Sequence, residues 1–509
     1  TTMALAAAAR ERGARIIEGV TVERIRTMGR RAVGVDTDLG PVDAEYVVTC
    51  AGMWSHELGR QAGVNVPLHA CEHFYLVTEP VPDLPAGLPT LRDTDNCIYI
   101  KEDAGRLLVG AFEPVAKPFG AEGLPTDRPF MQLDEDWDHL APVYEKACER
   151  VPILGEIGIR LFFNGPESFT PDDRYLLGET PELRNHWVAT GFNSIGMQSA
   201  GGAGKVLAEW IVNGRPPMDL WDVDVRRMQS FQTNSRYLHD RSIEALGLLY
   251  AMHWPFRQVE TARGVRRSPV HDRLVALGAC LGEGGGWERP NWYAPEGVEP
   301  RDEPSYGRAN WFEYVAREHR HTREAVSLFD ESSFAKYRLD GPDAEKALSW
   351  ICANDVAVPP GRLVYTQLCN QRGGIEADLT VCRLAADQFY IVTGTGFATH
   401  DFNHIKRHIP DDAHAVLIDV TSAYGVLSLM GPRSRQILEV AAEGDVSAEA
   451  FPFFTVREIQ IGGAPVRALR VTYMGELGWE LHIPTEYMLT AYETLTEAGA
   501  AFGLMDAGY

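Results

Sequence analysis

Short runs of alternating apolar and polar residues fill the first part of the chain, separated by glycine or proline. Residues 3–12 are typical of an alanine-rich helix, residues 14–25 of a strand, and residues 31–52 of a hairpin that leads into a buried strand. The blocks PLHACEHFYLVTEP and NCIYIKEDAGRLLVGAF are rich in strand-forming residues and flank a proline-rich loop. Residues 133–160 have the period of an amphipathic helix that ends at Pro152. The pattern predicts a protein of mixed α and β structure.

The stretch from residue 164 to residue 210 has the order strand, glycine turn, helix. HWVATGF at 186–192 is an apolar strand, and a cluster of small residues opens the helix of GGAGKVLAEWIVNG at 201–214. Glycines let a backbone approach a flat or anionic ligand closely, and the free N–H groups of a helix start favour negative charge. A tight connection between strand and helix explains the same residues, so the glycines alone leave both interpretations open.

Length and charge narrow the possibilities. A chain of 509 residues predicts two to four domains. The excess of 71 acidic over 48 basic residues gives a formal net charge of -23, which argues against general nucleic-acid binding. The eight cysteines include no C-x-x-C pair, so we expect reduced thiols in a reducing compartment. No apolar run approaches the roughly 20 residues that cross a bilayer, so we expect no membrane insertion.

Three segments carry a resemblance to a known family. GPESFTPD, GFNSIGM and GGAGKVLAEWI resemble the C-terminal flavin-binding end of the D-amino-acid-oxidase-like superfamily, above all its sarcosine dehydrogenase and dimethylglycine dehydrogenase branch. In that branch a flavin oxidoreductase is fused to a folate-binding domain similar to the glycine-cleavage T-protein. LFDESSFAKYRLDGPDA, the strand around Asp378 and RVTYMGELGWELHIP resemble T-protein motifs in the same order.

The resemblance implies a multidomain protein of the α+β and α/β classes. Its parts would be the end of a Rossmann-like FAD domain with an antiparallel substrate sheet in residues 1–215, a central linker domain in 216–305, and the first part of a T-protein-like folate-binding domain in 306–509. Its cofactors would be FAD and tetrahydrofolate. The chain opens inside a helix, closes on GLMDAGY and contains no G-x-G-x-x-G, so we expect a piece cut from a longer protein at both ends.

The resemblance also implies a flavin site. His73 and Tyr99 match residues that lie beside the flavin, where an imidazole can influence the protonation of an amine and a phenol can hydrogen-bond a carboxylate. His69 is expected to be structural. Contacts to the flavin cofactor are implied for Val22, Ala51, Gly52, Gly191, Phe192, Asn193, Ser194, Ile195 and Gly196.

A folate site is implied in the second half of the chain. Asp378 would serve the reactive amine as a catalytic residue, and Glu480 would accept hydrogen bonds from the pterin edge. Tyr365, Tyr473 and Glu476 would lie nearby. Each carboxylate taken alone is equally typical of an ion pair or a turn.

The implied activity is the FAD-dependent oxidative demethylation of sarcosine or dimethylglycine, with the one-carbon unit captured by tetrahydrofolate. The electron acceptor would be an electron-transfer flavoprotein or oxygen. The location would be the cytoplasm in a bacterium or the mitochondrial matrix in a eukaryote. Two alternatives stay open: a non-enzymatic regulatory subunit of a phosphatase, and an aminomethyltransferase with a vestigial flavin unit.

Two further patterns are set aside. Gly204 and Lys205 resemble the end of a phosphate loop, but Val206 stands where that loop requires Ser or Thr. The helical spacing of His400, His404 and His408 could bind zinc from one face, but a third kind of ligand is missing. For these histidines we expect a solvated helix, and for the chain no metal.

Overall fold

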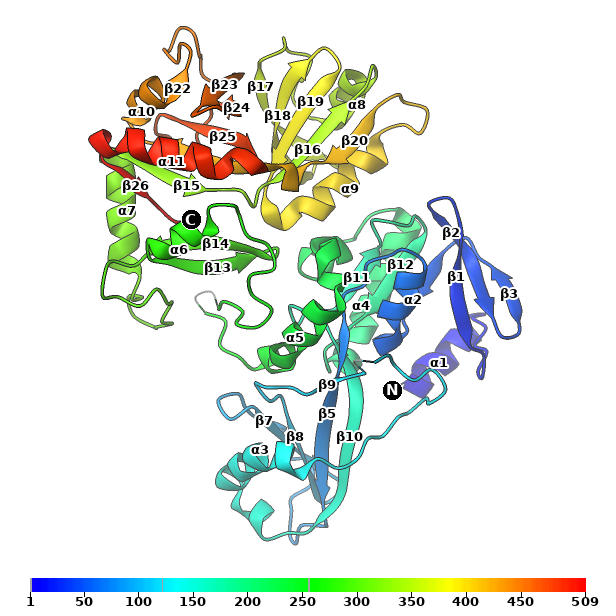
Figure 1. The fold of residues 1–509 in the computed structure, drawn as a ribbon. Coiled ribbons are helices and arrows are strands. Elements are labelled where there is room, and N and C mark those ends of the chain that lie inside the picture. The colour runs from blue at the N-terminus through cyan, green and yellow to red at the C-terminus, as the bar shows by residue number, and fades with distance from the viewer. Residues whose placement is uncertain (1, 121, 255–256) are drawn as a thin grey trace. The chain divides into compact units, whose positions relative to one another are not determined.

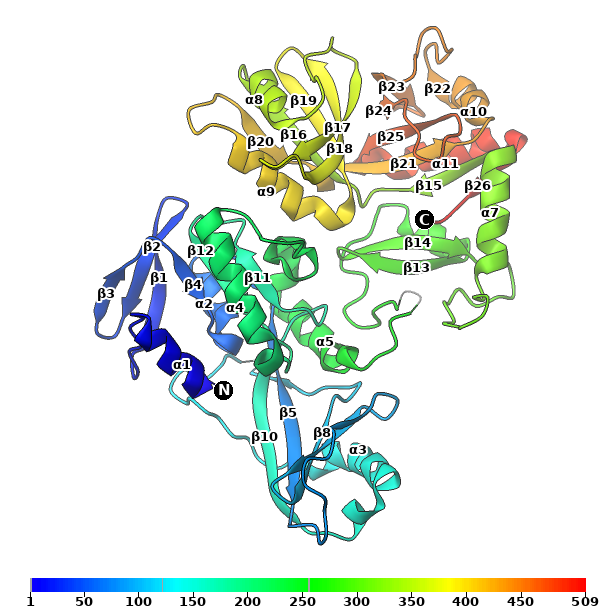
Figure 2. The same ribbon diagram turned by 180° about the vertical axis from the view of Figure 1, so that it is seen from behind.

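The computed structural model describes residues 2–120, 122–254 and 257–509. The chain divides into two compact units, one of Thr1–His253 with Glu260–Ala262 and one of Trp254–Val259 with Arg263–Tyr509 (Figures 1 and 2). This division runs through the predicted linker domain. The domain boundaries at residues 215 and 305 stay predictions.

The first unit begins with two small sheets. After α1 (Thr2–Glu11), the strands β1 (Val22–Met28), β2 (Arg31–Thr37) and β3 (Gly40–Asp43) form an antiparallel sheet. The second sheet has the order β11 (Leu176–Glu179), β12 (His186–Thr190) and β4 (Val47–Thr49), and its β12 and β4 are parallel. The helix α2 (Ser55–Gln61) follows β4, and α4 (Gly196–Asn213) follows β12. Strand, turn and helix thus follow one another twice at the same sheet.

A larger antiparallel sheet completes the first unit (Figure 2). Its order is β10 (Ile159–Phe169), β5 (His69–Thr78), β8 (Arg106–Ala111), β7 (Ile98–Asp103) and β6 (Leu91–Asp93), with the short β9 (Pro118–Phe119) beside β5. Phe74 and Leu76 of β5 are buried in one core cluster with residues of α3 (Trp137–Arg150), whereas His73 and Tyr75 alternate with them on the other face. The predicted antiparallel sheet and the helix before Pro152 are confirmed.

The predicted linker contributes elements to both units. The helix α5 (Ser235–Ala245) belongs to the first unit. The helix α6 (His271–Ala276) and the hairpin of β13 (Ala279–Gly284) and β14 (Trp287–Tyr293) belong to the second.

Two sheets form the rest of the second unit. The first has the order β22 (Ala442–Glu443), β23 (Val456–Ile461), β24 (Ala464–Leu469), β25 (Gly478–Pro484), β21 (Tyr424–Met430), β15 (Val326–Asp330) and β26 (Leu504–Asp506). The second has the order β17 (Leu363–Cys369), β18 (Ile375–Ala385), β19 (Gln388–Thr393), β16 (Ala335–Asp340) and β20 (Val416–Asp419). Besides α6, the helices of the second unit are α7 (Phe312–Glu324), α8 (Ala344–Ile351), α9 (Ala398–His408), α10 (Ser434–Ala441) and α11 (Met488–Gly499). A shared cluster with Tyr390 and Leu469 packs the two sheets together.

Two expectations were wrong in detail. The helix α4 begins at Gly196, so Gly201, Gly202 and Gly204 lie inside it rather than at its start. Burial of Ala203, Leu207 and Trp210 on its inner face offsets the roughly 1 kcal/mol that each glycine costs a helix.

The histidines of α9 are not on a solvated face. His400 and His404 are buried, and only His408 is exposed. His400 hydrogen-bonds Asp401 through Nδ1 at 2.9 Å, and its Nε2 lies 3.6 Å from Glu376. The hydrogen bond with His400 is the main reason why the pKa of Glu376 falls to about 2.

Candidate functional site

The flavin-binding residues predicted at two distant places in the sequence meet at one sheet edge. Because β4 and β12 are parallel neighbours, the residues that follow them leave the same edge. Ala51 and Gly52 follow β4, and Gly191 follows β12. The Thr190 hydroxyl donates to the Gly52 carbonyl at 3.2 Å. Gly52 has a φ of 54°, and an added Cβ there would meet open space.

The loop before α4 holds an unusual backbone. Asn193 and Ser194 have φ values of 48° and 63°, which non-glycine residues rarely adopt. The Asn193 side chain fixes this shape: its Oδ1 accepts from the Thr170 N–H at 2.8 Å, and its amide donates to the Thr170 hydroxyl at 3.1 Å. Strain held in place by such bonds is typical of ligand sites.

These features fit a flat, anionic cofactor. The free N–H groups at the start of α4 favour negative charge. Added Cβ atoms at Gly201, Gly202 and Gly204 would meet nothing within 4 Å. Phe192 stacks on Tyr175, while Ile195 precedes the first helical residue, Gly196. Val22 belongs to a different sheet, where it is 44% exposed at the start of β1.

One row of residues crosses the large sheet from edge to edge. Strand pairing places directly opposite one another Phe163, Tyr75, Gly110, Tyr99 and Arg92, one from each of β10, β5, β8, β7 and β6. Side chains at such paired positions share one face of a sheet. His73 lies two residues before Tyr75, so the period of two places it on the same face. We call this surface the aromatic face.

His73 and Tyr99 meet at Phe112 on the aromatic face. The Phe112 ring centroid lies 5.2 Å from that of His73 and 5.9 Å from that of Tyr99. His73 Nδ1 is buried and has no hydrogen-bond partner among the described residues. Burial raises the pKa of Tyr99 to about 12, so its phenol stays a hydrogen-bond donor.

The strand β10 leads from the His73 side of the aromatic face toward the loop at 191–196. The ring of Phe169 lies 6.0 Å from that of His73, and the next residue, Thr170, holds Asn193. Phe169 and Thr170 therefore link the His73 ring to the residue that shapes the loop at 191–196.

In the second unit, Asp378 and Tyr365 form an accessible pair. The Tyr365 hydroxyl donates to Asp378 Oδ2 at 2.6 Å, which raises the pKa of the phenol. Tyr365 is 48% exposed and Tyr473 is 96% exposed, so both rings are accessible to a ligand. Glu476 lies 3.4 Å from the guanidinium of Arg323. An aromatic and acidic surface of this kind fits a pterin.

Glu480 belongs to a different cluster, which contains a residue that the sequence reading missed. Glu480 pairs with Ser428 across β25 and β21, and the Ser428 hydroxyl donates to Glu331. The Glu480 side chain is 15% exposed, and its Oε2 lies 3.4 Å from His482 Nε2. Burial raises the pKa of both carboxyls above their usual range, and the charge of Glu480 raises that of Glu331 further. Glu331 directly follows the FD motif, but only the fold brings it to Glu480.

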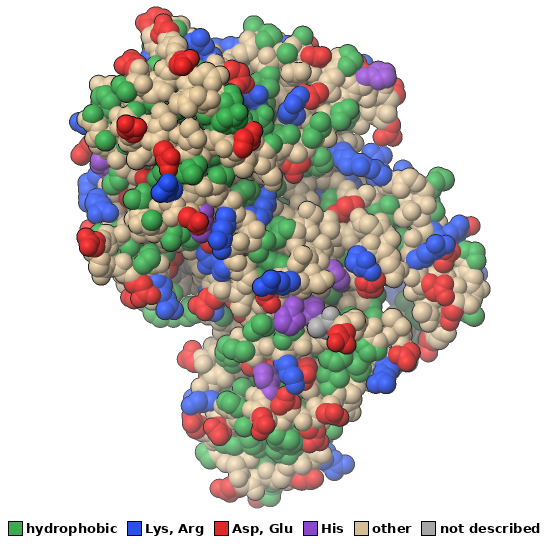
Figure 3. Space-filling model, in the orientation of Figure 1, with side chains coloured by type: hydrophobic (Ala, Val, Ile, Leu, Met, Phe, Trp, Pro, Cys, Tyr) green, Lys and Arg blue, Asp and Glu red, His purple; other side chains and the backbone are tan. Residues whose placement is uncertain are grey.

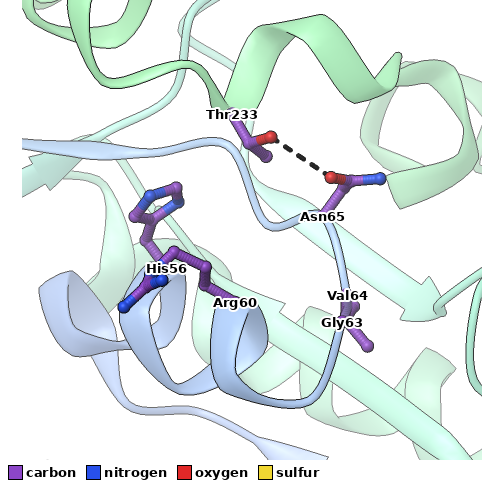
Figure 4. Close-up of a pocket in the computed structure, with 6 residues that line it drawn as sticks. All are labelled: His56, Arg60, Gly63, Val64, Asn65 and Thr233. Carbon is purple, nitrogen blue, oxygen red and sulfur yellow. Dashed lines mark hydrogen bonds between the residues drawn. The ribbon is translucent and has the colours of Figure 1, made fainter.

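The pocket drawn in Figure 4 is not a predicted site. It has a volume of about 230 Å³ and is lined by His56, Arg60, Gly63, Val64, Asn65 and Thr233. Its polar groups already have partners: the Thr233 hydroxyl donates to Asn65 at 3.2 Å, and His56 Nδ1 hydrogen-bonds the Val66 carbonyl. We assign no function to it.

The surface charges and the arrangement of potential metal ligands indicate no further binding site. Acidic and basic side chains are interspersed on the surface that Figure 3 shows. Among the described residues, no group of three or more His, Cys, Asp or Glu side chains is placed to hold a metal ion. None of the helices formed by the described residues is both long and apolar enough to cross a membrane.

Three family models match successive parts of the chain. Residues 1–210 match the FAD dependent oxidoreductase model, residues 213–268 its central domain, and residues 270–509 the GCVT N-terminal domain. The chain thus joins a region similar to FAD dependent oxidoreductases to a region similar to the GCVT N-terminal domain. The predicted multidomain fold and the predicted cofactors of this flavin–GCVT fusion, FAD and tetrahydrofolate, are confirmed.

Three curated relatives align with the whole of this flavin–GCVT chain. A 4-methylaminobutanoate oxidase (formaldehyde-forming) of Paenarthrobacter nicotinovorans is 44% identical and is covered to 61%. Human mitochondrial sarcosine dehydrogenase is 38% identical and is covered to 60%. The mouse mitochondrial pyruvate dehydrogenase phosphatase regulatory subunit is 36% identical and is covered to 59%. The chain thus spans about three fifths of the length of these relatives.

Proposed function

We propose that the protein oxidatively demethylates an N-methylated amino acid with FAD and transfers the one-carbon unit to tetrahydrofolate. The observation that carries the proposal is the aromatic face, where His73 and Tyr99 both pack on Phe112. Phe169 and Thr170 link His73 to the loop at 191–196, where we place the flavin. The folate half is supported by the accessible pair of Asp378 and Tyr365.

The residues of the first unit would bind and prepare the amine. The 51–52 turn and the 191–196 loop would hold FAD, which would supply the chemistry of hydride acceptance from the N-methyl carbon. An amine loses hydride readily only when it is neutral, and the unpaired Nδ1 of His73 can take its proton or hold its nitrogen in place. Tyr99 can donate a hydrogen bond to the substrate from a surface that its aromatic neighbours keep dry.

The residues of the second unit would serve the one-carbon carrier. Asp378 can hold the amine of tetrahydrofolate that captures the carbon, and Tyr365 orients this carboxylate through a 2.6 Å hydrogen bond. Glu480, still partly exposed, can accept hydrogen bonds from the pterin edge.

The substrate class is an N-methyl amino acid. Sarcosine and dimethylglycine are the substrates that the sequence motifs favour, and the 44% identical relative adds 4-methylaminobutanoate as a third candidate. An electron-transfer flavoprotein and oxygen both stay candidates for the electron acceptor, since one relative is named an oxidase and another a dehydrogenase.

A non-enzymatic regulatory role is the second candidate, favoured by the 36% identity with a phosphatase regulatory subunit. It requires no flavin chemistry. The His73 Nδ1 on the aromatic face supports the enzymatic proposal instead, because it has no partner among the described residues and can therefore meet a substrate amine.

The Asp378→Ala variant of the complete protein tests the coupling of the two halves. We expect amine oxidation to continue within about twofold of the original rate, because Asp378 lies outside the unit that carries His73. The rate of one-carbon transfer to tetrahydrofolate should fall by roughly 100-fold, the usual contribution of one positioned acid–base group, so that most of the carbon leaves as formaldehyde. Measuring formaldehyde release with and without tetrahydrofolate gives the fraction of the carbon that is transferred.

Asp387→Ala, an exposed carboxylate in the hairpin between β18 and β19, is the matched control. If the unaltered protein oxidised no amine and Asp378→Ala abolished its one-carbon transfer altogether, an aminomethyltransferase with a vestigial flavin unit would explain the chain better. If tetrahydrofolate did not lower formaldehyde release even in the unaltered protein, the folate half of the proposal would be wrong.

A further inference from the structure

Arg92 stands at one end of the aromatic face, and no ion pair joins it to a carboxylate of the described residues. Its strand β6 places it directly opposite Tyr99. The next residue, Asp93, points to the other face, where it lies 3.5 Å from Arg150 of α3. Among the described residues, the contact of the Arg92 guanidinium is with the ring of Tyr250, 5.8 Å from its centroid.

Tyr250 brings a second polar group to the same place. Only 8% of this residue is exposed, and its hydroxyl is buried with no hydrogen-bond partner among the described residues. Its ring packs on Phe112, with 4.7 Å between the centroids. A buried hydroxyl without a protein partner still has a hydrogen bond to give, which a water molecule or a ligand can take up.

The charges on this face suit an amino acid. Glu167 of β10 pairs with Cys71 of β5 on the side of the sheet that carries His73. The negative charge of Glu167 and the positive charge of Arg92 both act on Tyr99, in opposite directions. A ligand with an amine at one end and a carboxylate at the other would match them.

Because a guanidinium and a phenol are suited to binding a carboxylate, we propose that Arg92 and Tyr250 form the subsite that recognises the substrate's carboxylate. The methylamino end would then lie toward His73 and Tyr99. This inference rests on the proposed function and adds the residues that would select amino acids over simple amines. The fixed position of the carboxylate would also select among α- and ω-methylamino acids by chain length.

Binding of methoxyacetate tests the subsite without turnover. It carries the carboxylate but no oxidisable amine, and 2-methoxyethanol is the uncharged analogue. Both are titrated calorimetrically into the complete FAD-loaded protein. We expect Arg92→Gln to weaken methoxyacetate binding about tenfold or more, Tyr250→Phe to weaken it less, and Arg92→Lys to restore part of it. Binding of 2-methoxyethanol should not change.

Arg150→Gln is the matched control, because Arg150 is an exposed arginine on the opposite side of the same sheet. Equal methoxyacetate binding by the unaltered protein and Arg92→Gln would overturn the subsite, provided that circular dichroism shows a folded variant. Equally weakened binding of methoxyacetate and 2-methoxyethanol in Arg92→Gln would also overturn the subsite, since it would indicate a general disturbance of the aromatic face.

The kinetic arm separates this inference from the proposed function. Sarcosine, dimethylglycine and 4-methylaminobutanoate are compared with dimethylamine, which lacks a carboxylate. Arg92→Gln should raise KM for the amino acids and leave dimethylamine unaffected. If no amine reduced the flavin of the unaltered protein, the proposed function would fail, while the methoxyacetate titration would still decide whether a carboxylate binds at Arg92.

Discussion

Individual carboxyl groups in the second unit illustrate how burial changes chemistry. Glu331 and Glu480 lie on either side of Ser428, and burial raises the pKa of both. Two close carboxyls do not ionise independently, so the pair keeps a proton above the pH at which a free glutamic acid loses it. Since a pterin edge offers N–H donors, ionised Glu480 beside protonated Glu331 is the arrangement that suits it.

The Glu331→Gln variant tests this pair through its pH dependence. The folded state holds a proton that the unfolded chain releases above about pH 4.3, so stability falls as the pH rises from there into the neutral range. Glutamine keeps the acceptor for Ser428 but cannot lose that proton. We expect urea unfolding to show a gain of about 1–2 kcal/mol at pH 8 and little change at pH 5.

The exposed Glu324→Gln serves as the control and should change stability at neither pH. A loss of stability at pH 8 in Glu331→Gln would contradict the proton kept by the pair. It would indicate instead that the ionised form of Glu331 is the one that the fold stabilises.

Strands and helices place the catalytic candidates. In the large sheet, alternation along β5 buries Phe74 with the residues of α3 and leaves His73 on the aromatic face. Gly110 is the position that lets the Tyr99 ring lie across the sheet, because an added Cβ there would come 2.1 Å from Cζ of that ring. No side chain fits at 110 unless Tyr99 moves.

Gly110→Ala should therefore displace Tyr99. We expect a loss of about 1–3 kcal/mol of stability, the usual range for an overpacked core, and a weaker binding of the amine substrate. Thermal unfolding and KM measure the two effects. Gly155→Ala is the control, since an added Cβ there meets nothing within 4 Å. Unchanged stability and KM in Gly110→Ala would show that Tyr99 is not held as described.

Most elements could be predicted from the sequence because each has a clear hydrophobic period. The start of α4 could not, since Gly201, Gly202 and Gly204 resemble breakers until the burial of Leu207 and Trp210 is known. The burial of His400 could not be predicted either, because it depends on contacts with Glu376 of β18 and with the adjacent Asp401. The spacing of residues predicts a helix but not which elements pack against it.

At the scale of the whole molecule, each cofactor has its candidate residues inside one compact unit. The residues His73, Tyr99 and Asn193 lie in the first unit, and Asp378 and Glu480 in the second. Family motifs indicated both sets. They did not indicate that Asp378 and Glu480 stand on different sheets, or that Arg92 lies over the ring of Tyr250, because these arrangements depend on the fold and not on distance along the chain.

The most direct test of the central claim is an anaerobic absorption spectrum of the complete protein with bound FAD. Sarcosine, dimethylglycine and 4-methylaminobutanoate are added in turn, and the flavin band near about 450 nm is followed. Our account predicts that at least one of them bleaches this band, and the rates rank the substrates. A bound flavin that none of these N-methyl amino acids reduces would contradict the account and favour a regulatory protein.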